Sequence, residues 1–158
     1  MTVLTIIVQW LHVILGVFWF GSNLYVDAIL IPTLNNLPLK EQQKIGGLIG
    51  PRTSQVLVPV GLTVVALGIL RGTVFGRLHT LEAVFGTAYG LTWLVALLLS
   101  VGIILWGLLA LKPRAEALNT AESPEAYGAI INQLKVLTLV EIAGFVAVFT
   151  CMILMRFE

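Results

Sequence analysis

Four long apolar stretches constrain this chain more than any other feature of its sequence. A helix needs about 20 apolar residues to cross the hydrocarbon core of a bilayer. Stretches of at least that length are expected at about 3–31, 52–71, 85–111 and 134–157. No water reaches the backbone there, so each stretch must form a helix that satisfies its own hydrogen bonds. The sequence therefore predicts an all-α polytopic membrane protein, a four-transmembrane-helix bundle.

Composition supports one small domain over residues 1–158 with the lipid bilayer as its main partner. Hydrophobic residues make up 58% of the chain and charged residues 11%, and the mean hydropathy is +1.00. The net charge of +1 gives no basis for a nucleic-acid partner. The single cysteine, Cys151, excludes an intrachain disulfide and a thiolate zinc cluster. The first apolar stretch lacks a basic segment before it and a cleavage site, so we expect it to be a retained helix.

Proline and capping residues give the expected helix ends. The first span should stop at Pro32, and the third should be closed by Lys112-Pro113. The second should open near Pro51 or Arg52, after a short interfacial helix at 39–45. The fourth helix can begin before its apolar part, because Ser123 is an N-cap residue followed by proline.

Basic residues in the loops predict the orientation. Short loops on the cytoplasmic side are enriched in lysine and arginine. One side holds six of them: Lys40, Lys44, Arg52, Lys112, Arg114 and Lys135. The other holds three: Arg71, Arg77 and Arg156. The count predicts a multi-pass protein of the inner (plasma) membrane with both termini on the outer (periplasmic) side.

A polar stripe follows one face of the first span. Its members are three or four residues apart, so they stack on one side of a helix. The stripe consists of Gln9, His12, Gly16, Trp19, Asn23 and Asp27. Such a face must look into protein, cofactor or water, and intramembrane titratable residues commonly have a function.

His12 is the strongest candidate for a cofactor ligand, and His79 is the only other histidine. The predicted topology puts both near the outer surface, where two imidazoles could hold the iron of a b-type haem. The other cofactor-binding candidates are two arginines for the propionates, a glycine that admits the macrocycle and an aromatic wall: Arg71, Arg77, Gly16 and Trp19. The alternatives are a His12 hydrogen-bonded to a neighbouring helix and a His79 solvated in its loop.

Two carboxylates lie toward the inner half. For Asp27 we expect an ion pair with Arg52 or Lys135, because charges in membranes tend to find partners. Glu141 has no cation predicted at its depth. Either carboxylate could instead carry protons.

Copper is the alternative cofactor. Cys151, Met152 and Met155 cluster at the outer end of the fourth span, and thiolate and thioether ligands favour Cu(I). The same residues are also ordinary fillers of apolar helices.

Short motifs resemble a known membrane family. Trp10-Leu11-His12, Trp19-Phe20-Gly21, Ile31-Pro32 and Thr87-Ala88-Tyr89-Gly90 resemble the copper resistance protein D-like (CopD-like) family of membrane proteins. The first-helix pattern is also similar to HemJ-type protoporphyrinogen oxidases, whose helix-one histidine is a haem ligand, a role that maps onto His12. Those oxidases use a third-helix lysine where this sequence has Ala96, so the resemblance implies haem binding more directly than that activity.

These observations predict electron transfer by a small membrane cytochrome or an accessory subunit of a redox complex. Two imidazole ligands would leave no open position on the iron, so no catalytic residue is assigned. Oxidation of quinol or a porphyrin is the enzymatic alternative, and a copper transporter or a cofactor-free structural subunit are the others. Expected partners are other membrane subunits or an outer-side electron-transfer protein, in a homo- or hetero-oligomer.

Overall fold

The computed structural model describes residues 2–157, and these are almost entirely helical. The elements are α1 (Val3–Tyr25), η1 (Val26–Leu30), α2 (Ile31–Leu34), α3 (Leu39–Gly72), α4 (Leu81–Phe85), α5 (Ala88–Trp106), η2 (Gly107–Leu111), α6 (Lys112–Leu118) and α7 (Pro124–Phe157). The segments η1 and η2 are π-helical, with backbone hydrogen bonds that span five residues instead of four. Residues 2–157 contain no strand, so the all-α prediction is confirmed.

Four continuous helical units are long and apolar enough to cross a membrane. They cover Val3–Leu34, Leu39–Gly72, Ala88–Leu118 and Pro124–Phe157. The predicted number of spans is therefore confirmed. Large apolar side chains such as Leu98 and Leu139 point out of the bundle and are more than half exposed, as expected of lipid-facing positions.

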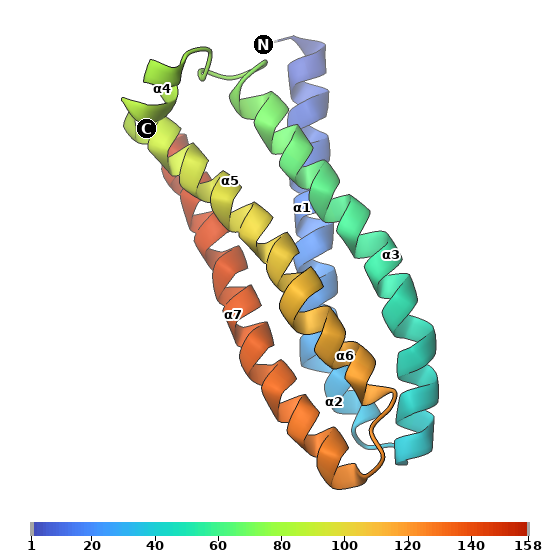
Figure 1. Cartoon of the computed structure of the whole chain (residues 1–158). Helices are drawn as coiled ribbons and strands as arrows, with labels where there is room; N and C mark the ends of the chain where they lie inside the picture. The colour runs from blue at the N-terminus through green and yellow to red at the C-terminus, as the bar shows by residue number, and fades with distance from the viewer. Residues whose placement is uncertain (1, 158) are drawn as a thin grey trace.

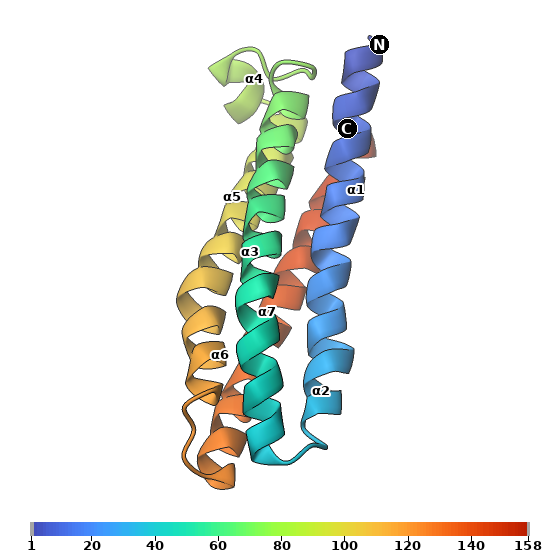
Figure 2. The same ribbon diagram turned by 90° about the vertical axis from the view of Figure 1, so that its right-hand side faces the viewer.

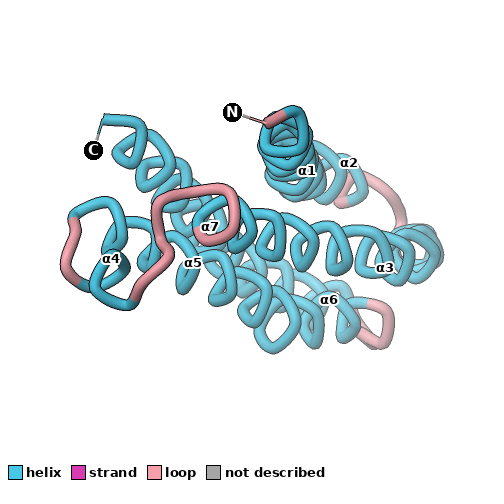
Figure 3. Tube along the Cα trace, turned by 90° about the horizontal axis from the view of Figure 1, so that it is seen from above, coloured by secondary structure: helices cyan, strands magenta, loops and turns pink. Residues whose placement is uncertain are grey.

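The chain passes up and down through the bundle, so that α1 begins and α7 ends at the same end (Figure 1). Helix α1 packs against α3, α3 against α5, and α5 against α7 (Figure 2). We call the half that contains the two chain ends the upper half, and the half that contains α2 and α6 the lower half. Seen from above, α4 lies on the side of α5, away from α1 (Figure 3).

The two expected proline stops are wrong, because the backbone changes register before each proline. Pro32 has no N–H to offer the carbonyl four residues earlier. Just before it, the Ile31 N–H bonds to the Val26 carbonyl, five residues back, and the helix continues to Leu34. The Lys112 N–H bonds to the Gly107 carbonyl in the same way before Pro113. Both helices therefore pass their prolines through a π-helical segment.

The other two helices also extend beyond the predicted apolar spans. Helix α3 starts at Leu39, so the expected interfacial helix is continuous with the second span, and Pro51 lies inside it. Helix α7 starts at Pro124, where the Ser123 Oγ accepts the Ala126 N–H at 3.2 Å. The predicted N-cap is therefore confirmed.

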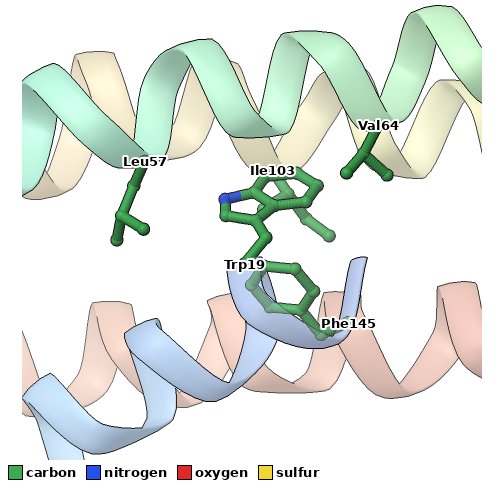
Figure 4. Close-up of a cluster of buried hydrophobic side chains, with 5 residues drawn as sticks. All are labelled: Trp19, Leu57, Val64, Ile103 and Phe145. Atoms are coloured by element: carbon green, nitrogen blue, oxygen red, sulfur yellow. The ribbon is translucent and has the colours of Figure 1, made fainter. Parts of the chain in front are cut away.

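A layer of buried side chains separates the upper half from the lower half. Trp19, Leu57, Val64, Ile103 and Phe145 converge there from α1, α3, α5 and α7 (Figure 4). We call this cluster the Trp19 layer. The Trp19 and Phe145 rings meet edge to face with centroids 4.8 Å apart. A Cβ at Gly61 would lie only 3.0 Å from the Trp19 indole, so the missing side chain lets the ring reach α3.

Candidate functional site

His12 lies in the upper half, on the face of α1 that packs against α3. Its Nδ1 is 3.0 Å from the carbonyl oxygen of Val64. A carbonyl can only accept, so Nδ1 carries the proton and donates. In the neutral ring, Nε2 then keeps the lone pair that a metal ion would need.

A glycine on α3 makes this contact with His12 possible. A Cβ built at Gly68 would lie 3.1 Å from the His12 Cε1. Any larger side chain at this position would therefore push the imidazole away from α3. Gly16, where the sequence predicted that a macrocycle could approach the backbone, lies one turn below His12. A Cβ built at Gly16 would lie 4.0 Å from the Val64 Cγ1, an ordinary contact distance.

Trp93 holds α3 from its other side and was not predicted as a site residue. Its indole N–H donates to the Gly68 carbonyl at 3.3 Å. His12 and Trp93 thus bond to carbonyls one turn apart on α3, from α1 and α5 respectively. A tryptophan in an apolar span does not by itself indicate such a bond, because it equally suits an interface anchor.

Arg71, predicted from the sequence as a propionate partner, reaches the polar stripe of α1. Its Nε donates to the Gln9 Oε1 at 2.9 Å, and its Nη1 donates to the Phe75 carbonyl at 3.1 Å. Gln9 is one turn from His12 on the same face. The structure therefore brings together His12, Gln9 and Arg71.

His79 and Arg77 lie in the loop before α4 and not beside His12. The loop buries Leu78, whose N–H bonds to the Gly72 carbonyl at 3.1 Å, while the neighbouring His79 is exposed. The Arg77 guanidinium lies over the Tyr89 ring, 5.6 Å from its centroid. The His12 ring bonds to the Val64 carbonyl, and among residues 2–157 no group of three His, Cys, Asp or Glu side chains could hold a metal ion.

Two further predicted site residues lie elsewhere in the bundle. Trp19 belongs to the buried layer below His12, where it packs on Gly61 and Phe145. Cys151 is a partly buried free thiol on α7. Within the described part of the chain, it joins no cluster of potential metal ligands.

The lower half contains a cavity of about 490 Å³ below the Trp19 layer. Most of its lining surface is apolar, and its polar side chains include Asn23, Asp27, Thr138 and Glu141. Small-molecule sites commonly have volumes of about 300–1,000 Å³ and this kind of lining. Three of these residues, Asn23, Asp27 and Glu141, were candidates from the sequence, which does not show that they share one cavity.

The expected ion pair of Asp27 is wrong. The Asp27 Oδ1 accepts a hydrogen bond from the Thr138 hydroxyl at 3.3 Å, while Arg52 and Lys135 are exposed. The only salt bridge within residues 2–157 joins Lys112 to Glu116, at 3.9 Å. Thr138 was missed because a threonine in an apolar span has no distinctive pattern.

The chain matches no family model, no curated protein and no solved structure. The resemblance to the CopD-like family and to HemJ-type oxidases therefore stays a prediction.

Proposed function

We propose that this protein binds a b-type haem through the His12 Nε2 and transfers electrons in the membrane. It would act as a small membrane cytochrome or as an accessory subunit of a redox complex. The observation that carries the proposal is the hydrogen bond from the His12 Nδ1 to the Val64 carbonyl. Histidines that bind metals commonly donate their other ring N–H to a carbonyl or carboxylate, which fixes the tautomer and the ring plane.

The residues around His12 suit one axial position of a haem. A neutral imidazole with a fixed ring is the donor that haem iron takes. Arg71 bonds to Gln9, one helical turn above His12, and could donate a charge-assisted hydrogen bond to a propionate. When bound, the haem would supply one-electron chemistry. The chain's own contribution would be to hold the imidazole and to keep the site apart from the lower half.

The second axial ligand is a separate question. His79 remains the predicted partner by sequence, although its side chain is exposed and lies before α4. A five-coordinate haem held by His12 alone agrees better with the contacts described above. The spin state of the iron distinguishes these two arrangements.

We further propose that the upper end of the bundle faces the outer side of the membrane. The lower end holds six basic residues and the upper end three. An excess of lysine and arginine marks the cytoplasmic side. The protein would then lie in the inner (plasma) membrane, with both chain ends on its outer side.

The test is a reduced-minus-oxidised visible spectrum of the purified protein, expressed with haem supplied. We expect a b-type band that is lost in His12→Ala and retained in His79→Ala. The matched histidine variant controls for nonspecific effects of removing an imidazole. A colourless wild-type protein would refute the proposal, and stoichiometric copper that requires Cys151 would support the copper alternative instead. If His79→Ala converts low-spin iron to high-spin iron, His79 is the second ligand.

A further inference from the structure

Two carboxyl groups lie in the lower cavity without a cation beside them. Asp27 accepts one hydrogen bond, from the Thr138 hydroxyl. Glu141 is only 7% exposed, and no hydrogen bond or salt bridge engages its side chain within residues 2–157. It lies one turn from Thr138 on α7, so both carboxyls meet the same part of the cavity. A buried charge without a partner is costly, particularly at membrane depth.

The charged groups at the cavity do not balance. Its lining includes the carboxyls of Asp27, Glu116 and Glu141 and the ammonium group of Lys112. Lys112 pairs with Glu116 at 3.9 Å. Asp27 and Glu141 therefore remain without a counterion.

Two amides line the same cavity at different levels: Asn23 lies one turn above Asp27, and Gln42 lies in the first turn of α3 at the lower end of the bundle. The Gln42 Nε2 donates to the Leu37 carbonyl at 2.6 Å, while its Oε1 is buried and has no hydrogen-bond partner. Gln42 as a whole is only 9% exposed and lines the cavity. The Asn23 Nδ2 donates to the Trp19 carbonyl at 3.0 Å, which leaves its oxygen as an acceptor. The Asn23 oxygen, close to Asp27, is therefore open to a ligand that brings donors.

Both π-helical segments border this cavity. Asp27 lies in η1 and Gly107 begins η2. A Cβ at Gly107 would lie 3.9 Å from the Glu141 Oε1, so the absent side chain leaves room directly before the carboxyl. Single π-helical turns occur frequently at functional sites. Two such segments, on different helices, face the same cavity.

We propose that the lower cavity binds a small lipophilic ammonium ion between Asp27 and Glu141. The charged N–H groups would meet the two carboxyls, and the apolar body would contact the apolar walls. A bare metal ion fits less well, because hard cations need several oxygen ligands close together. This site does not depend on haem at His12, which lies above the Trp19 layer.

The experiment is equilibrium dialysis of radiolabelled 2-phenylethylammonium against the full-length protein in detergent micelles. We expect one saturable site, and little binding of 2-phenylethanol, which has the same body without the charge. Glu141→Gln and Asp27→Asn should each weaken binding by about tenfold or more, because hydrogen bonds to charged groups contribute about 1.5–3 kcal/mol. The exposed Glu82, on α4 at the upper end, provides the matched control Glu82→Gln, which should bind normally.

A second variant tests the cavity without changing a carboxyl. Gly107→Leu would place a side chain in front of Glu141 and should abolish binding. His12→Ala should bind the ammonium ion normally, so failure of the haem proposal would be distinguishable from failure of this one. Equal affinity for the alcohol, retained affinity in Gly107→Leu, or displacement of the probe by equimolar sodium would each overturn the proposal. Should a variant not fold, as judged by helix content, the wild-type comparison of ammonium with alcohol still decides.

Discussion

The two halves of the bundle differ in whether buried polar groups are left without a partner. In the upper half, His12 and Trp93 each donate to a backbone carbonyl of α3, and Arg71 bonds to Gln9. In the lower half, Glu141 and the Gln42 oxygen are buried without such partners beside a cavity. The upper half is therefore satisfied by direct packing, whereas the lower half leaves acceptors for something that the chain itself does not supply.

Backbone geometry accounts for this difference. Glycines at 61 and 68 of α3 let side chains from α1 approach closely. In the lower half, η1 and η2 widen two of the helices at the level of the cavity. Close helix packing brings donors to acceptors, while a π-helical turn shifts the register and opens space. The Trp19 layer, whose five side chains are drawn in Figure 4, lies between His12 and the two carboxyls.

The largest expected effect comes from filling the space at Gly68, where the His12 ring packs against α3. Gly68→Leu should abolish the haem spectrum, because its side chain would take the place of the His12 imidazole. Ammonium binding in the lower cavity should be unchanged. Gly102→Leu is the matched control, since a Cβ there meets nothing within 4 Å. A normal haem spectrum in Gly68→Leu would show that the packing of the His12 ring on Gly68 does not position His12.

Removing the layer between the halves should destabilise the whole bundle. Trp19→Ala should lower the free energy of unfolding by about 3–5 kcal/mol, as expected for truncating a buried aromatic side chain. The measurement is a denaturant titration in mixed micelles, followed by helix content. Trp10 is 63% exposed, so Trp10→Ala should change stability by less than about 0.5 kcal/mol. Equal effects of the two variants would mean that the Trp19 layer does not hold the halves together.

A smaller effect is expected from the single hydrogen bond to Asp27. Thr138→Val keeps the shape of the side chain but removes the donor to the Asp27 carboxyl. Stability should fall by about 1 kcal/mol, measured by the same titration. Thr150→Val is the control: its hydroxyl bonds to a carbonyl of its own helix and is exposed. If both variants lose the same stability, Thr138 has no special role in holding Asp27.

The helices themselves could be predicted because their causes are local. Hydrophobic length gave the four spans, and the Ser123-Pro124 cap gave the start of α7. The prolines misled the prediction at Pro32 and Pro113 because a helix inside a bundle can bypass the missing N–H by shifting to i−5 bonds. Local sequence gives the cost of a proline but not how the surrounding structure compensates for it.

For the candidate sites, too, local features could be predicted from the sequence, whereas contacts between helices could not. By itself, the sequence predicted a polar stripe along the first span that faces the protein, with His12 in its first half and Asp27 near its last residues. Only the tertiary structure decided that His12 bonds to a backbone carbonyl, that Asp27 bonds to Thr138, and that His79 is exposed outside the bundle. The physical reason is that a carbonyl belongs to every residue and has no sequence signature. Which one a side chain meets depends on the register between helices that are distant in the chain.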